Sequence, residues 1–146
     1  MIVVDTSILL YSVGEDHPLR DPCRRLVDAV RRGKVPATAT AEVIQEFVHV
    51  RGRRRPRSDA VALGRDFVRL LRPLVGLEDA DLDRGFRLFE RTLALGAFDA
   101  VLAAVALRLR AQALVSADKG FGSVPGLKYV DPASHELERL LPTGPG

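Results

Sequence analysis

The sequence predicts an α/β fold, with a short parallel sheet that carries helices on both faces. The stretches 2–4 and 113–116 are short apolar runs, typical of strands buried on both sides. Amphipathic helical patterns lie between these runs, and strands alternating with helices favour a parallel sheet. The 146 residues contain no internal repeat, linker or low-complexity block. One domain is therefore expected.

The composition fits a globular chain, with 47% hydrophobic residues. No stretch of eighteen or more apolar residues predicts a membrane span, and the first residues lack the basic region and cleavage site of a secretory signal. A single cysteine, Cys23, cannot form an internal disulfide, which favours the cytoplasm. The 22 basic and 19 acidic residues give a net charge of +3. The basic residues are mostly arginine, which suits phosphate contacts but can equally reflect genome composition.

The first half of the chain predicts several helices around one further strand. After the first strand, residues 8–11 continue as a helical turn or a loop, and a break follows. Helices are expected over 22–32, 41–51 and 58–71, a strand within 35–40, and a short strand or connector over 73–76. Gly52 and Pro56 are expected to end the second of these helices, and Ser58 is a candidate cap for the third.

The second half predicts a central helix and the end of the domain. Residues 100–107 are apolar nearly all round, which is typical of a fully buried helix. A helix over 79–95, a strand over 127–130 and a terminal helix over 132–141 complete the pattern. The domain is therefore expected over 1–141, with a disordered tail over 142–146.

Four acids occupy unusual positions. Asp5 ends the first strand, and Asp118 follows the strand 113–116 by two residues. Asp99 lies at the start of the apolar helix, and Glu46 lies on a helix with buried neighbours. In a parallel sheet, strand ends and the helix starts that follow share one rim, so Asp5, Asp99 and Asp118 can converge there. Clustered carboxylates repel one another unless a cation lies among them, and a divalent metal is the natural candidate.

The expected ligands are all oxygens, because the three histidines are scattered along the chain. Oxygen ligation indicates magnesium, with manganese as a substitute, rather than zinc. Magnesium held by carboxylates suits phosphate chemistry, since it polarises a phosphoryl oxygen and lowers the pKa of a bound water.

Simpler roles compete with this interpretation. Asp5 and Asp99 are each suited to cap a helix, and Asp118 is a common turn residue. Glu46 alone fits a solvated helix position, and Glu42, one turn earlier, competes with it. The metal-site hypothesis therefore depends on all four acids together.

The arginine-rich stretch 51–57 has two interpretations. It is a cationic loop for an RNA backbone, or else a solvated turn or a patch for a protein partner. No aromatic residues are interleaved with the arginines to stack on bases, which favours the second interpretation.

The chain resembles the PIN-domain family, and within it the VapC-type ribonuclease toxins of bacterial toxin–antitoxin pairs. Four pieces carry the resemblance in the family's order: Ile2-Val-Val-Asp-Thr-Ser7, Glu42-Val-Ile-Gln-Glu-Phe-Val48, Phe98-Asp-Ala-Val-Leu-Ala-Ala104 and Val115-Ser-Ala-Asp-Lys-Gly-Phe121. The match makes Asp5, Glu46, Asp99 and Asp118 the four acids of the site. Glu46 is preferred to Glu42 because Gln45-Glu46-Phe47 resembles the family's second motif.

The resemblance implies a three-layer α/β/α fold and a magnesium-dependent endoribonuclease that hydrolyses RNA with metal-activated water. Asp5, Asp99 and Asp118 are then expected to hold the metal, and Glu46 to position water or a second metal. Thr6 and Ser116 are weaker candidates for a supporting role, in which their hydroxyls would contact and orient these acids. The resemblance also implies neutralisation by a small cognate antitoxin, and a homodimer.

Two other kinds of function compete with this one. A haloacid-dehalogenase-like phosphatase is expected to carry a second Asp two residues after the first, where Ser7 stands. A response-regulator receiver is expected to carry an adjacent acid pair at an early strand end, and that pattern is missing as well. A catalytically silent domain that only binds protein or RNA is the non-enzymatic alternative.

Overall fold

The computed structural model describes residues 1–143. They form seven α-helices, one 3-10 helix (η1) and four strands. In chain order these are β1 (Ile2–Val4), α1 (Thr6–Val13), α2 (Arg20–Arg31), β2 (Ala37–Thr38), α3 (Ala41–Arg54), α4 (Arg57–Leu71), α5 (Asp79–Arg91), α6 (Ala97–Arg108), β3 (Ala113–Val115), η1 (Lys119–Ser123), β4 (Tyr129–Val130) and α7 (Glu136–Leu140).

The four strands form one parallel sheet in the order β2-β1-β3-β4. Val4, the last residue of β1, pairs with Val115, the last residue of β3. The chain leaves β1 toward β2 on one side and later returns to β3 on the other, so the strand order reverses between β1 and β3. In open α/β sheets, ligands bind in the crevice outside the strand ends at such a switch point.

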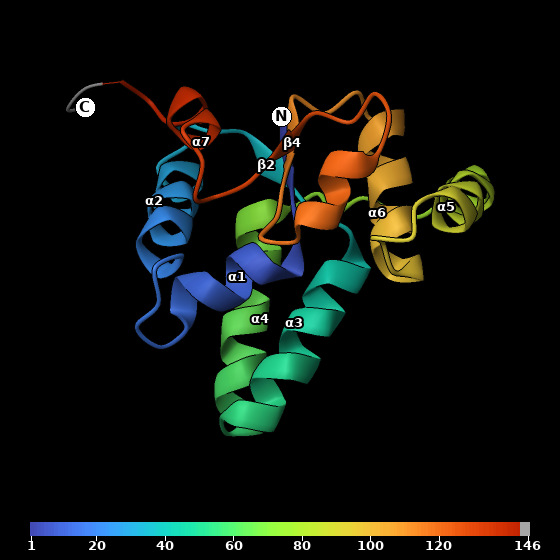
Figure 1. Cartoon of the computed structure of the whole chain (residues 1–146). Coiled ribbons are helices and arrows are strands. Elements are labelled where there is room, and N and C mark those ends of the chain that lie inside the picture. The colour runs from blue at the N-terminus through green and yellow to red at the C-terminus, as the bar shows by residue number, and fades with distance from the viewer. Residues whose placement is uncertain (144–146) are drawn as a thin grey trace.

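The predicted three-layer α/β/α arrangement is confirmed. In Figure 1, α1, α2 and α7 lie on one side of the sheet, and α6 lies on the other with α5 outside it. Residues 100–106 of α6 are all buried, as expected for the central helix. β1 and β3 are buried along their whole length, which explains why both read as continuous apolar runs.

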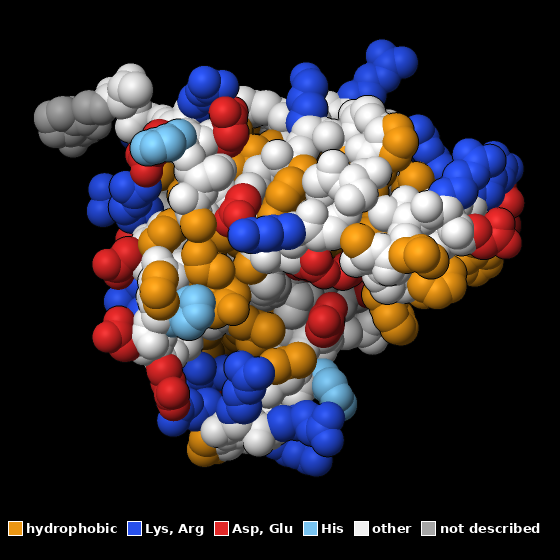
Figure 2. Space-filling model, viewed as in Figure 1, with side chains coloured by type: hydrophobic (Ala, Val, Ile, Leu, Met, Phe, Trp, Pro, Cys, Tyr) orange, Lys and Arg blue, Asp and Glu red, His pale blue; other side chains and the backbone are white. Residues whose placement is uncertain are grey.

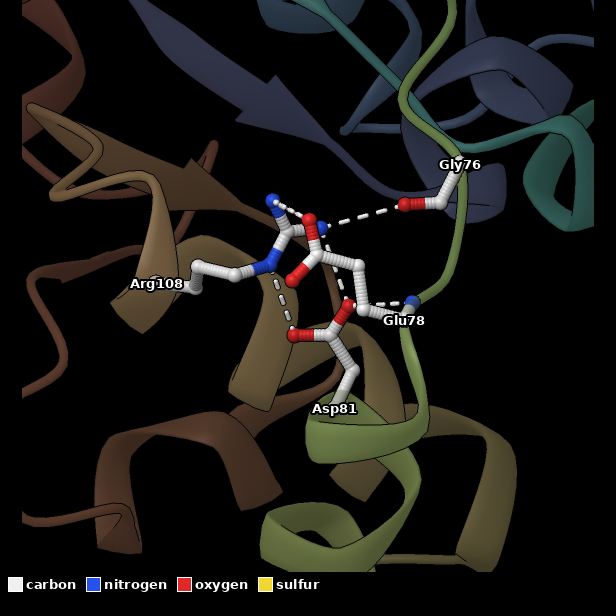
Figure 3. A network of polar contacts seen from close by, with 4 residues as sticks. All are labelled: Gly76, Glu78, Asp81 and Arg108. Atoms are coloured by element: carbon white, nitrogen blue, oxygen red, sulfur yellow. Dashed lines mark hydrogen bonds and ion pairs between the residues drawn. The ribbon is translucent and has the colours of Figure 1, made fainter.

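A buried ion pair joins α5 to α6. Arg108, at the end of α6, donates from Nε and Nη2 to the two carboxylate oxygens of Asp81, both at 2.9 Å (Figure 3). Asp81 also accepts from the backbone N–H of Glu78, and Arg108 reaches the Gly76 carbonyl at 3.1 Å. The Asp81 carboxylate is only 2% exposed, and the bond from Arg108 holds its pKa below the usual range. The network fixes the start of α5, which forms one wall of the site described below.

Two expectations around the arginine-rich stretch are wrong. α3 continues through Gly52 to Arg54, because Gly52 lies where α3 packs closely on α4, near Ala60. α4 then begins at Arg57, with Pro56 in the non-helical position before it. Ser58 therefore lies inside the first turn and is not a cap.

The other helices and strands are of the expected type, but their first and last residues differ from the expected bounds. Residues 8–11 belong to a full helix, α1, and Val75 of the connector pairs with Thr40 only through an isolated bridge. The helix expected to reach residue 95 ends at Arg91, and the terminal helix is shorter than expected. Of the expected tail, residues 144–146 lie outside the described residues. In the described chain, no helix is long and apolar enough to cross a membrane.

Candidate active site

Asp5 stands at the end of β1, in the N-cap position of α1, but its side chain caps no backbone N–H. Its Oδ2 instead accepts hydrogen bonds from Ser116 Oγ at 2.6 Å and from Ser7 Oγ at 3.0 Å. Ser116 directly follows β3, so the bond spans the switch point between β1 and β3. Asp5 is only 6% exposed. Two hydroxyl donors thus fix the carboxylate at the rim of the sheet, and the capping role weighed from the sequence is wrong.

Asp99 lies in the first turn of α6, where the helix dipole favours an anion. Burial and the neighbouring acids outweigh that preference. Burial raises the pKa of Asp99 to about 7, aided by the negative charge of Asp5, a side-chain hydrogen bond with Asp118, and the charges of Asp118 and Glu46. The other three predicted acids therefore all act on Asp99 at this rim. Asp118 Oδ1 also accepts from the Gly120 N–H at 2.8 Å, so the turn role considered for Asp118 is confirmed alongside this proximity.

Glu46 reaches the cluster from α3. Its Oε2 accepts a 3.1 Å hydrogen bond from Thr6 Oγ1, which also donates to the Val43 carbonyl. Glu42 lies one turn earlier in the same groove, with a buried Oε2 that has no hydrogen-bond partner in the described chain. Glu46, unlike Glu42, contributes to the pKa shift of Asp99. The geometry favours Glu46 as the second acid, which stays a prediction.

A groove of about 810 Å³ opens over these acids. Its acidic part includes Asp5, Glu42, Glu46 and Asp99, and its apolar part comes largely from α5 and α6. The apolar lining residues include Leu77, Leu82, Phe86, Phe98, Val101 and Leu102. Figure 2 shows acidic side chains inside a hollow on this face, between α3 and α6. The groove combines an anionic floor with an exposed apolar wall.

The donor set suits a hard divalent cation. Every acidic donor is a carboxylate oxygen, and a bound cation would offset both the burial and the neighbouring negative charges that raise the pKa of Asp99. Within residues 1–143, no three acid, histidine or cysteine side chains already stand in an arrangement that holds a metal. The chemistry of these donors therefore fits a hard divalent cation.

Ser7 is the site residue that sequence reasoning missed. It donates to Asp5, accepts from the Ala117 N–H at 3.0 Å, and lies 3.3 Å from Ser116 Oγ. The expected supporting hydroxyls of Thr6 and Ser116 do contact acids of the site, Glu46 and Asp5. The position of Ser7, two residues after Asp5, was the sequence feature that pointed to a role in the site. Its contacts with residues 116 and 117 were not visible in the sequence.

Comparison with known proteins places this chain in a family. The PIN-domain family model, described as "PIN domain", matches residues 2–127. The chain therefore belongs to the PIN-domain family. Within that family it groups with the VapC ribonucleases. Ribonuclease VapC7 of Mycobacterium tuberculosis is 52% identical over 145 residues, covering 97% of this chain and 98% of the relative. Ribonuclease VapC13 of the same organism is 32% identical over 134 residues, covering 88% and 98%.

Solved structures share the fold at low sequence identity. The crystal structure of Mycobacterium tuberculosis VapC20, described as a sarcin-ricin loop cleaving toxin, has a TM-score of 0.72 at 18% identity and covers 88% of this chain and 98% of its own. VapBC2 from Rickettsia felis, bound to a DNA fragment from its promoter, has a TM-score of 0.69 at 18% identity and covers 90% and 98%. These likenesses confirm the predicted architecture.

Proposed function

We propose that this chain is the toxin of a toxin–antitoxin pair, a divalent-metal-dependent endoribonuclease that hydrolyses RNA phosphodiester bonds. The observation that carries the proposal is the convergence of Asp5, Glu46 and Asp118 on Asp99 at one rim, where burial and then these neighbouring acids raise the pKa of Asp99 to about 7. The relatives named as VapC ribonucleases support the choice of RNA as substrate. RNA cleavage places the activity in the cytoplasm.

Each acid has a proposed role. Asp5, held by Ser7 and Ser116, and Asp99, at the start of α6, hold the metal most directly, and Asp118 completes the set. Magnesium held by these acids, or manganese in its place, would supply Lewis-acid stabilisation of the negative charge that develops on the phosphoryl oxygens. Glu46 is oriented by Thr6 and faces the same groove, where it positions the attacking water.

The apolar wall of the groove supports a protein partner. Phe86 is 55% exposed and Phe98 is 85% exposed, and both line the groove beside the acids. An exposed apolar patch next to a functional site is typical of an interaction surface. We assign this wall to the cognate antitoxin, which blocks the acidic floor when it binds. A homodimer is proposed from the family resemblance alone.

Cleavage of RNA by matched variants tests the proposed activity. Purified wild-type protein is incubated with total RNA, with and without Mg²⁺, and the cleavage ends are mapped. The Asp5→Asn and Asp99→Asn variants should each lose at least 100-fold in rate, because each removes one carboxylate of the set. Asp28→Asn, an exposed acid on α2 outside both pockets of the described chain, is the control for charge and should cleave normally. Full activity in Asp5→Asn would overturn the assignment.

A further inference from the structure

A second pocket adjoins the acidic site and has no role in the proposed chemistry. It encloses about 540 Å³ between α1, the loop after it, and the end of α3. Its lining includes Ser7, Tyr11, His17, Arg51, Arg54 and Arg55. Ser7 also hydrogen-bonds to Asp5, so one side chain belongs to both sites. Below the acidic hollow in Figure 2, Lys and Arg side chains gather around the end of α3 and the start of α4.

Helices α1 and α3 connect the two sites because they run alongside each other in the same direction. Near their starts, Thr6 bonds to Val43 and Glu46. Near their ends, Arg51 Nη1 donates to the Val13 carbonyl at 3.1 Å. At 1.5 Å of rise per residue, Arg54 stands roughly 12 Å beyond Glu46 along α3. A bound polymer that extends from the acidic floor along α1 therefore reaches these arginines next.

The arginines of this pocket differ in how far they are already engaged. Arg51 is paired with Asp59 at 2.8 Å and is largely buried, so it holds the pocket in shape. Arg55 meets Glu15 at 3.3 Å, but Glu15 is 85% exposed, and water screens such a pair. Arg54 is exposed and has no ion-pair or hydrogen-bond partner among residues 1–143. Arg54 is the guanidinium that is free to bind an added anion.

The pocket also has an aromatic side, which comes from a different part of the chain. The rings of Tyr11 and His17 lie 4.7 Å apart between centroids, tilted by 32°. His17 Nδ1 accepts from the Leu19 N–H at 3.1 Å, which helps to hold its ring in place. Aromatic rings beside cationic groups are how proteins bind single-stranded nucleic acid, with bases stacked and phosphates paired. The stretch 51–57 contains no aromatic residue, but α1 and the loop after it place Tyr11 and His17 in the same pocket as its arginines.

We propose that this pocket binds the RNA substrate beside the scissile bond, with Arg54 on a backbone phosphate and Tyr11 under a base. The proposal rests on the proposed function and adds to it the direction in which the bound RNA leaves the acidic site. An anionic chain needs such an anchor, because the acidic floor alone repels phosphate. RNA is favoured over an acidic protein segment because Ser7 links this pocket directly to the acids.

RNA binding by paired arginine variants tests this subsite. The Asp5→Asn background prevents turnover, and the probe is a fluorescein-labelled single-stranded oligouridylate followed by anisotropy over a series of KCl concentrations. Arg54→Gln should weaken binding about 3–10-fold and reduce the slope of log affinity against log salt by about 0.7, the loss of one phosphate contact. Tyr11→Leu should weaken binding about tenfold with an unchanged salt slope.

The matched control is Arg110→Gln, which removes the same charge from an exposed position after α6, at the opposite end of the sheet. It should leave both affinity and salt slope unchanged. In otherwise wild-type protein, Arg54→Gln should raise the KM for RNA cleavage and leave kcat unchanged. If Arg54→Gln matches Arg110→Gln in every measurement while wild-type protein cleaves RNA, the subsite is overturned and the proposed function stands. A wild-type chain that cleaves no RNA with metal overturns both.

Discussion

Ser116 Oγ donates a 2.6 Å hydrogen bond to Asp5 Oδ2 across the junction of β1 and β3, and both residues are buried. The Ser116 carbonyl in turn accepts from the Tyr129 hydroxyl at 2.9 Å on the next strand. The position of the Asp5 carboxylate is thus set by a residue at the end of the neighbouring strand, β3, which is far from Asp5 in the sequence. This relationship makes Ser116 a positioning residue for the acid site.

Ser116→Ala should reduce metal affinity and kcat/KM for RNA by about 10–100-fold, as is typical when a group that orients a metal ligand is removed. The fold should persist, because Ser7 still donates to Asp5. Calorimetric titration with Mg²⁺ and single-turnover cleavage measure the two effects. Ser12→Ala is the control, since Ser12 is buried and its hydroxyl bonds, within residues 1–143, only to the Leu9 carbonyl at 2.8 Å. Equal metal affinity in both variants would contradict the positioning role.

Asp99 makes the metal-free protein less stable as the pH rises. Its pKa is raised to about 7, so between about pH 4 and pH 7 the folded state holds a proton that the unfolded state has released. The stability linked to this proton is complete below about pH 4 and is lost as the pH rises through about 7. Thermal unfolding of metal-free protein across this range should show the decline. Added Mg²⁺ should reverse it at neutral pH, because a cation favours the ionised carboxylate.

Asp99→Asn is the control for that pH dependence. The variant should lose this part of the decline and should be more stable than wild type at neutral pH without metal, by a few degrees in Tm. Mg²⁺ should stabilise it less than it stabilises wild type. An identical pH profile in the two proteins would show that the acid cluster does not raise the pKa of Asp99.

The Arg108–Asp81 pair should contribute to stability without contributing to chemistry. Asp81→Asn should cost about 1–3 kcal/mol of unfolding free energy, below the 3–5 kcal/mol of a fully buried pair because Arg108 is partly exposed. The pKa of Asp81 is lowered, so this stability is present above its ordinary pKa and is lost as the pH falls through the folded value.

Urea unfolding at neutral and acid pH measures the contribution of this pair, with Asp83→Asn as the control. Asp83 pairs with Arg87 on the exposed face of the same helix, where such a pair contributes at most about 0.5 kcal/mol. Cleavage per folded molecule should match wild type in both variants. If Asp81→Asn costs no more than Asp83→Asn, the pair does not hold α5 in place.

Much of the fold could be predicted because its signals are local. The apolar runs of β1 and β3 require burial on both faces, and the apolar surface of α6 requires a central position. A parallel sheet then places the residues after each strand at one rim, which brings Asp5 and Asp118 together with Asp99. Helix ends were less predictable. Gly52 does not stop α3, because packing against α4 outweighs the roughly 1 kcal/mol cost of glycine in a helix.

The rest of the site depends on contacts between distant segments, which no local pattern encodes. Ser7 meets Ala117 across the switch point, and Tyr11 and His17 come beside Arg54 only because α1 lies along α3. Arg108 and Asp81 are 27 residues apart and form a pair only when α5 packs on α6. The sequence shows all these residues without showing which of them meet.

Metal binding and RNA cleavage measured together on the same preparations test the central claim most directly. Mg²⁺ is titrated calorimetrically into wild-type protein, Asp5→Asn and Asp28→Asn, and each preparation is then assayed on total RNA with and without EDTA. We predict that wild type and Asp28→Asn bind Mg²⁺ and cleave RNA only when it is present, and that Asp5→Asn does neither. Cleavage by wild type in EDTA, or undiminished cleavage by Asp5→Asn, would contradict a metal-dependent ribonuclease centred on Asp5.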